Sequence, residues 1–465
     1  MRFTEKDVCY GEVRSPEDLF VNEPVELTDA TIHERLSRTY DAMTERGLDI
    51  LVIYADREHY GNFKFLSGFS PRFEEALLIL HKDKKNYFML GNEMMGMEAH
   101  SRIRAEAIHT SYFSLPNQPM EKEPFKKLLE KAQIVKGSVI GVAGWKLFTS
   151  TAEDNEQLFD VPFYIVQSLK ELAGEKGRVV NAADIFIHPG SGVRIRVNAN
   201  EIAYFEYGAM LVSSRILDAM NRADAGMTEM EIADGLEALG QPITVQTICA
   251  GEDRFRNAVV QPRNKRIELG DTISITLGMC GGLTARKAVM ARDKEDLRET
   301  DRAYLDQMVK PYFAAAAAWY SSVHVGMRAG DLYDSIENCI PKKIYGWKLN
   351  PGHYIGEEEW LSSPVYPDSD VILASGTMLQ MDILISRRGM KGVNAEDGIA
   401  LADKALREEL REQYPKVWER IQRRRDYMIQ ELRIPLHEDV LPLSDLAGYL
   451  RPYILNHSKA MKLVH

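Results

Sequence analysis

The first part of the chain alternates between amphipathic and wholly apolar segments. Leu36, Tyr40 and Met43 recur at helical spacing after Thr31, a pattern that predicts a helix ending near residue 47. Short apolar runs predict strands at residues 50–54, 76–80, 87–90, 139–142 and 161–166. Helices that alternate with strands indicate an α/β domain. We place this domain at residues 31–188, after an N-terminal arm of residues 1–30.

The pattern changes after residue 188. Residues 199–223 place Ile202, Phe205 and Ala209 on one face and predict a long helix, and Thr228 with Glu231 predicts the capping box of a second helix. Strand-like runs follow at residues 272–277, 371–373, 378–385 and 398–401. These segments predict an α+β domain over residues 189–432, followed by a Pro-containing tail of residues 433–465.

The composition and charge of the chain limit the kinds of partner that we expect it to bind. Apolar residues make up 45% and charged residues 27% of the 465, which is typical of a globular protein. The 58 basic and 69 acidic side chains give a net charge of −11 without a run of Lys or Arg, so we expect no nucleic-acid partner. No apolar stretch approaches the length of a membrane span, and residues 1–7 are charged, so we expect no membrane partner and a cytoplasmic location.

Several short motifs occur in an order that resembles one superfamily. They include FLSGF at residues 65–69, GDTISI at 270–275, PGHYIG at 351–356, GTM at 376–378 and Glu396-Asp397. Together they resemble the pita-bread superfamily of methionine and Xaa-Pro aminopeptidases, prolidase and creatinase. The resemblance implies a creatinase-like N-terminal α/β domain and a pita-bread C-terminal α+β domain.

The resemblance also identifies positions that hold two metal ions in the peptidases, through two Asp, one His and two Glu. His353, Asp382 and Glu396 match three of these positions and retain ligand chemistry. The two Asp positions match Thr276 and Arg286, or Lys287 if the turn is gapped differently. The family's substrate-side His is also missing from residues 257–262.

These replacements lead us to expect no metal cofactor. A cation about 4 Å from a divalent metal is repelled by roughly 8 kcal/mol at an effective dielectric constant of about 20. A single ion held by His353, Asp382 and Glu396 is the alternative if Arg286 points away. We expect Arg286 to pair with Asp382, either to bind substrate or as a structural replacement for the lost metal. The run of Glu357, Glu358 and Glu359 reads as a solvated loop.

The leading hypothesis is therefore a creatinase-like, metal-independent hydrolase that cleaves a C–N bond of a small polar or zwitterionic substrate. His353, Glu396 and Asp382 would be catalytic. The predicted substrate-binding residues are Arg286, Thr276, Lys287, His59 and Arg387. Two alternatives remain: a degenerate Xaa-Pro aminopeptidase or dipeptidase with at most one metal, and a non-catalytic protein that binds a peptide or a partner. The resemblance also implies a homodimer in which His59 reaches the neighbouring site.

Overall fold

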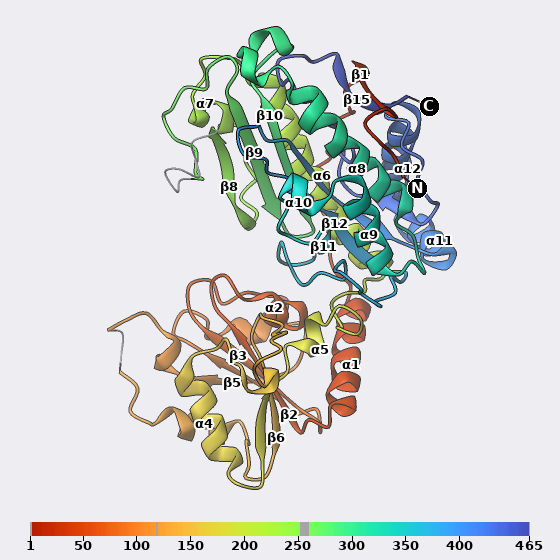
Figure 1. The fold of residues 1–465 in the computed structure, drawn as a ribbon. Coiled ribbons are helices and arrows are strands. Elements are labelled where there is room, and N and C mark those ends of the chain that lie inside the picture. Colours follow the sequence, from red (N-terminus) through yellow and green to blue (C-terminus); the bar gives the residue numbers. More distant parts are fainter. Residues whose placement is uncertain (1, 118–119, 252–259, 465) are drawn as a thin grey trace. The chain divides into compact units, whose positions relative to one another are not determined.

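The computed structural model describes residues 2–117, 120–251 and 260–464 (Figure 1). These residues form two compact units, Leu27–Ile195 and a larger one that combines Met1–Glu26 with Arg196–His465. The predicted site segment at residues 257–262 lies partly outside the described residues. Among the described helices, none has both the length and the apolar character needed to cross a bilayer.

The smaller unit is an α/β domain around a six-stranded sheet. In spatial order its strands are β5 (Glu106–His109), β4 (Asn86–Leu90), β3 (Ala76–His81), β2 (Ile50–Ala55), β6 (Val139–Ala143) and β7 (Arg178–Asn181). Its helices are α1 (Asp29–Glu45), α2 (Gly61–Ser67), α3 (Phe125–Lys131), α4 (Phe163–Ala173) and α5 (Asp184–Ile187). The strand expected at residues 161–166 is wrong, because the apolar residues of α4 continue at helical spacing as Ile165, Leu169 and Leu172.

The larger unit is built on a seven-stranded sheet. Its order is β11 (His353–Tyr354), β12 (Thr377–Met381), β13 (Asn394–Leu401), β10 (Gly282–Val289), β9 (Thr272–Met279) and β8 (Ile243–Gly251), with β14 (Val440–Pro442) pairing with β13. Its helices are α6 (Ala199–Arg222), α7 (Glu229–Ala233), α8 (Lys310–Ser322), α9 (Ala329–Cys339), α10 (Lys342–Tyr345), α11 (Lys404–Gln413) and α12 (Pro415–Gln430). The run expected as a strand at 371–373 forms only an isolated bridge through Ile372.

Both ends of the chain belong to the larger unit. Strand β1 (Val8–Glu12) pairs antiparallel with β15 (Lys459–Leu463), so the N-terminal arm and the C-terminal tail form a small sheet of their own. The division into units falls at Leu27 and after Ile195, a few residues from the boundaries read from the sequence.

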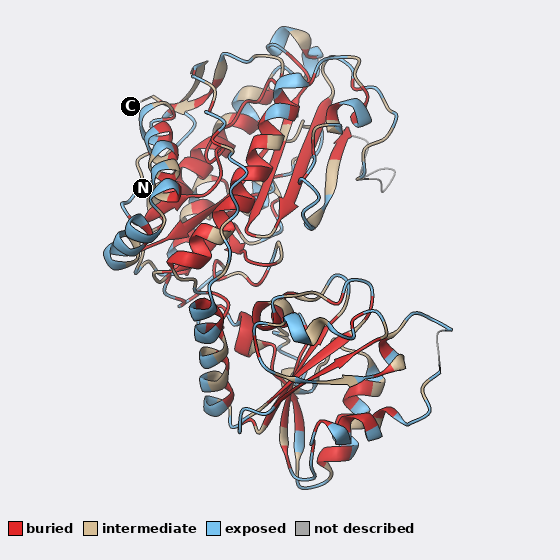
Figure 2. Ribbon diagram, turned by 180° about the vertical axis from the view of Figure 1, so that it is seen from behind, coloured by how far each residue is buried: buried red, intermediate tan, exposed pale blue. Residues whose placement is uncertain are grey.

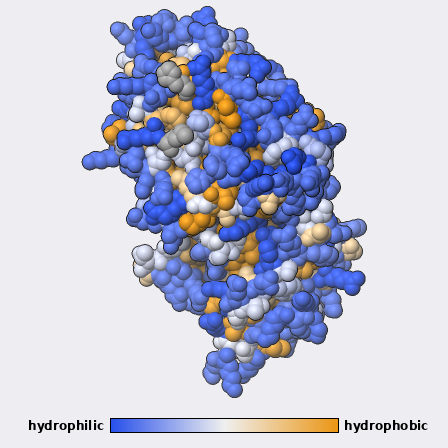
Figure 3. Space-filling view, turned by 90° about the vertical axis from the view of Figure 1, so that its right-hand side faces the viewer, coloured by the Kyte–Doolittle hydropathy of each residue, from blue (hydrophilic) through white to orange (hydrophobic). Residues whose placement is uncertain are grey.

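Burial follows the expected pattern over most of the molecule. Figure 2 shows buried strands and exposed outer faces on the helices α1, α11 and α12. Figure 3 shows hydrophilic side chains over most of the visible face, with apolar residues in small groups. Charged side chains buried inside the larger unit are therefore exceptions, and each one needs a partner or a function.

The hairpin of β9 and β10 fixes the register of the central sheet. Met279 pairs with Gly282, which leaves Cys280 and Gly281 as a two-residue turn. Gly281 has a φ of +83°, and a Cβ there would lie 2.5 Å from Phe205 of α6, so both the turn and the close helix require glycine. This turn places Ala285 opposite Thr276 on one side and opposite Glu396 on the other.

Candidate metal centre on one face of the central sheet

Neighbouring strands bring three potential ligands to one face of the sheet. Glu396 lies on β13, Asp382 directly follows β12, and His353 begins β11 opposite Gln380. One ligand atom from each of His353, Asp382 and Glu396 lies within 4.8 Å of the others. Their exposed fractions are 1%, 4% and 7%, so the group is almost fully withdrawn from water.

His353 is oriented as a ligand. Its Nδ1 lies 3.1 Å from the backbone oxygen of Tyr354, and its Nε2 lies 3.9 Å from Oε1 of Glu396. A hydrogen bond from Nδ1 to the Tyr354 carbonyl leaves the lone pair of Nε2 directed at the carboxylates, the arrangement seen in many metal-binding histidines. Burial lowers the pKa of His353, which favours the neutral ring that a metal requires.

No Lys or Arg among the described residues forms an ion pair with Asp382 or Glu396. Among the described residues, Oδ1 of Asp382 is buried without a hydrogen-bond partner. Burial, and then the charge of Glu396, raises the pKa of Asp382 well above its usual range. Burial, and then the charge of Glu359, raises the pKa of Glu396 to about 8. A cation at this position would relieve both the repulsion and the unmet hydrogen-bonding capacity.

Residues from the loop after β11 lie around the group of His353, Asp382 and Glu396. The ring of Trp360 stacks on His353 with centroids 4.0 Å apart, and Trp360 stays 38% exposed. Burial raises the pKa of Glu359, whose charge acts on His353, Asp382 and Glu396. Glu357 is only 2% exposed, and its Oε2 lies 3.1 Å from the thiol of Cys280.

The expectation of a solvated acidic loop at residues 357–359 is therefore wrong. A run of acidic residues normally marks an exposed segment, but this one folds against the ligand face because it directly follows the short strand that carries His353. Glu359 and Trp360 are the site residues that the sequence interpretation missed. Their position within seven residues of His353 was the only available signal.

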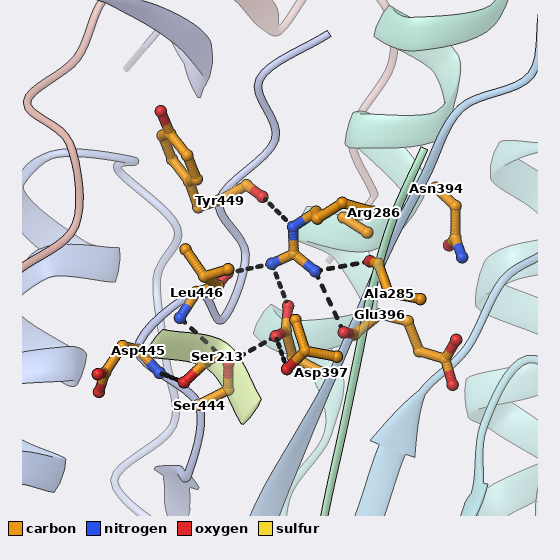
Figure 4. A network of polar contacts seen from close by, with 12 residues as sticks. Ser213, Ala285, Arg286, Asn394, Glu396, Asp397, Ser444, Asp445, Leu446 and Tyr449 are labelled. Atoms are coloured by element: carbon orange, nitrogen blue, oxygen red, sulfur yellow. Dashed lines mark hydrogen bonds and ion pairs between the residues drawn. The ribbon is translucent and has the colours of Figure 1, made fainter. Parts of the chain in front are cut away.

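Arg286 does not take part in this group. The register places it on the opposite face of the sheet, where Nη2 lies 2.6 Å from Oδ2 of Asp397. Its nitrogens also donate to the backbone oxygens of Ala285, Glu396, Leu446 and Tyr449 (Figure 4). The expected pairing of Arg286 with Asp382 is wrong, because Arg286 is paired with Ala395 on β13 and its side chain therefore lies on the face of Asp397, opposite to that of Glu396.

The positions of the two missing Asp can now be assigned by geometry. Thr276 and Ala285 lie opposite each other on the ligand face, and Ala285 is next to Glu396. Neither side chain has a carboxylate. Lys287 shares that face two residues further along β10, with its side chain against Gly392. Among the described residues, this face therefore brings together a His and two carboxylates, a set that could hold a divalent ion.

Two further predicted substrate residues, Arg387 and His59, have other contacts in the structure. Arg387 donates to the backbone oxygen of Gln307 and lies over the ring of Tyr345. His59 belongs to the smaller unit, where it contacts Asp56 and stacks on Trp145 with centroids 4.4 Å apart. Their proposed substrate roles remain predictions.

Fold and site together define a pita-bread protein with a metal-type ligand group. Residues 208–403 match the model of Metallopeptidase family M24. The chain has the pita-bread fold that its motifs implied, with the expected α/β and α+β domains. A search of curated proteins found no match.

Solved structures share the fold at low sequence identity. A prolidase from Thermococcus sibiricus is 17% identical with a TM-score of 0.62, covering 80% of this chain and 95% of its own. A prolidase from Pyrococcus horikoshii OT3 is 19% identical with a TM-score of 0.59, covering 79% and 95%. A Xaa-Pro dipeptidase from Bacillus anthracis is 16% identical with a TM-score of 0.59, covering 80% and 96%.

The expectation of no metal cofactor is corrected by these findings. The matching family is one of metallopeptidases, and His353, Asp382 and Glu396 converge as a possible metal site. The repulsion argument depended on Arg286 facing the site, and Arg286 is instead neutralised by Asp397 on the other face of the sheet.

Proposed function

We propose that this protein is a hydrolase of the M24 type that uses one divalent metal ion and acts on small peptides of the Xaa-Pro kind. The observation that carries the proposal is the buried group of His353, Asp382 and Glu396, with Oδ1 of Asp382 unpartnered among the described residues. The M24 match and the prolidase-like fold support the peptide substrate.

The ligand face suggests a division of roles among its residues. His353 would bind the ion through Nε2, and Asp382 and Glu396 would bind it through carboxylate oxygens. A divalent ion in such a site polarises a carbonyl group and lowers the pKa of water. Glu359 would hold a proton on its carboxylate near the reacting amide, since burial already raises its pKa.

Trp360 and Gln380 would shape the site. Trp360 keeps one ring face on His353, and its exposed part offers an apolar surface to a substrate ring such as that of proline. Gln380 donates to the Leu283 carbonyl at 2.6 Å and to Glu396 at 3.4 Å, which holds the Glu396 carboxylate in place.

Metal titration is the first test. We expect calorimetry with Mn²⁺, Zn²⁺ or Co²⁺ to give one ion per chain, and hydrolysis of Xaa-Pro dipeptides to require that ion. Two ions per chain would refute the single-ion proposal, and binding of none would refute the metal-dependent mechanism. The homodimer stays a prediction, which sedimentation at micromolar concentration tests.

A further inference from the structure

The smaller unit carries an open apolar hollow along helix α4 (Figure 1). Its volume is about 750 Å³, and it shares no residue with the group of His353, Asp382 and Glu396. Apolar side chains form most of the hollow, and polar ones stand at its rim. The apolar residues are Leu158, Phe159, Val161, Phe163 and Val166, and the polar residues are Gln157, Gln167, Lys170 and Glu171.

The floor of the hollow is continuous with the core of the smaller unit. Val166 is buried on α4, and Phe159 and Val161 are partly buried and pack against the core cluster that contains Ile165 and Leu169. These contacts fix the floor from below. The hollow is therefore a preformed apolar surface that is open on its outer side, where Gln167, Lys170 and Glu171 are exposed.

Phe163 stands at the border of this hollow as an exposed aromatic ring. It is the first residue of α4, directly after the N-cap Pro162, and it is 78% exposed. A single exposed apolar residue needs no explanation, but a ring beside an apolar hollow forms a continuous patch, and such patches mark interaction surfaces. Aromatic residues also supply much of the binding energy at the centres of interfaces.

Two copies of this patch complement each other in shape. Each copy presents a projecting ring with a hollow beside it, and a two-fold axis brings the ring of one copy to the hollow of the other. A small ligand in the hollow would leave the outer side of the Phe163 ring in water. A second copy covers the ring and fills the hollow at the same time.

The charges at the rim also suit a second copy. Lys170 and Glu171 supply one charge of each sign, so the patch has no net charge, whereas the whole chain carries −11. Two copies therefore repel each other at long range, and a neutral patch adds nothing to this repulsion. Two-fold symmetry allows Lys170 of one copy to approach Glu171 of the other.

We propose that the hollow along α4 is one half of a two-fold interface between two copies of this chain. The Phe163 ring of each copy occupies the apolar hollow of the other, and the polar rim residues surround the buried rings. This inference does not depend on the proposed hydrolase function.

Sedimentation velocity over a range of about 1–100 μM tests the proposal. The unchanged protein should form dimers as its concentration rises. Phe163→Asp should raise the dissociation constant at least about 100-fold, because two-fold symmetry places the substitution twice in the interface and each lost ring costs about tenfold. A monomer over the whole range for the unchanged protein would overturn the proposal.

Met230→Asp is the matched control for this variant. Met230 is 56% exposed and lies in the first turn of α7, as Phe163 lies in the first turn of α4. Both variants should fold, because an acidic residue in the first turn of a helix is favourable, and thermal unfolding checks this. Met230→Asp should leave the dissociation constant unchanged. An equal loss in both variants would show only a general effect of added negative charge and would refute the interface.

Photochemical cross-linking locates the contact. Chains with a benzophenone amino acid in place of Phe163 are mixed with isotopically labelled, unsubstituted chains and irradiated. The cross-link should join two chains and should attach within residues 157–171 of the labelled one. Attachment only within one chain, or to another segment of the labelled chain, would refute the interface.

Other occupants of the hollow give different results. A dimer that persists in Phe163→Asp would use another surface, such as the one that the predicted role of His59 requires, and would overturn this inference without bearing on the hydrolase activity. A protein that stays monomeric and takes up a small apolar dye in the hollow would assign the hollow to a small molecule, which would also overturn it.

Discussion

Neighbouring carboxylates on the two faces of the central sheet differ in whether the protein neutralises their charge. Asp397 is paired with Arg286 and accepts a hydrogen bond from Ser444 (Figure 4). It also accepts one from Thr284. Glu396, the preceding residue on β13, points to the other face, toward Asp382 and His353, and it forms no ion pair with a Lys or Arg of the described residues. The first face has its charges satisfied by the protein itself, and the second keeps anionic oxygens available. Two buried carboxylates that are neighbours on one strand can therefore differ in role: Asp397 is part of a structural ion pair, whereas Glu396 remains available to bind a cation.

On the face with paired charges, the buried ion pair of Arg286 and Asp397 occupies a place in the core that apolar side chains usually fill. The side chains of Arg286 and Asp397 are 2% and 0% exposed, and the guanidinium also joins β10 to the segment that carries Leu446 and Tyr449. Breaking such a pair leaves a buried ion, which costs more than the pair itself contributes. The ligand face has no such internal compensation, so its residues should be replaceable with less loss of stability.

The largest expected effect concerns the paired face. Arg286→Ala should lower the free energy of unfolding by about 3–5 kcal/mol, because Asp397 is left buried and uncompensated. Urea denaturation measures this change. The matched variant Glu396→Gln should cost no more than about 1 kcal/mol, the contribution of an ordinary hydrogen bond. Similar losses in both variants would contradict the distinction between the two faces.

The second prediction removes a ligand from the other face. His353→Ala should reduce divalent-metal affinity by at least about 100-fold, the upper end of what loss of an outer-sphere partner costs. Calorimetry with Mn²⁺ or Zn²⁺ measures the affinity. His59→Ala serves as the control because His59 belongs to the other unit. Unchanged affinity in His353→Ala would remove this residue from the ligand set.

The third prediction tests the register. Thr276→Asp combined with Ala285→Asp should raise the metal stoichiometry from one to two, because both carboxylates then lie on the ligand face beside Glu396. Atomic absorption after gel filtration gives the count.

The control for this experiment moves the second substitution by one position, from Ala285 to Arg286. Thr276→Asp with Arg286→Asp places the second carboxylate on the opposite face and should bind no second ion. It should also be much less stable, because Asp397 loses its partner. A second ion in this variant, and none in the Ala285 variant, would show that the register is shifted.

The smallest expected effect concerns Trp360. Trp360→Ala should weaken metal binding by less than about tenfold, because an aromatic contact contributes about 0.5–1.5 kcal/mol and here acts only by positioning His353. Trp360→Phe should restore most of the affinity. Trp145→Ala removes the comparable stack on His59 and should leave metal binding unchanged. A loss in Trp360→Ala as large as that in His353→Ala would mean that Trp360 does more than position the ring.

Local sequence patterns were sufficient for much of the fold. Periodic apolar residues predicted the helix that became α6, and the capping box predicted at Thr228 and Glu231 is present at the start of α7. The apolar runs of β2 and β3 also appear as strands. The run at residues 161–166 failed because a short apolar segment has no periodicity that separates a strand from the first turn of a helix.

The sequence by itself determined which residues are candidate metal ligands, and only the tertiary structure decided on which face of the sheet each residue lies. Motif order was enough to single out His353, Asp382 and Glu396, because each lies beside a short recognisable pattern. The face of Arg286 depended on a two-residue turn between β9 and β10, where one residue more or less exchanges the two faces. That register is set by pairing with β13 and by the close approach of α6 to Gly281, contacts between segments far apart in the chain.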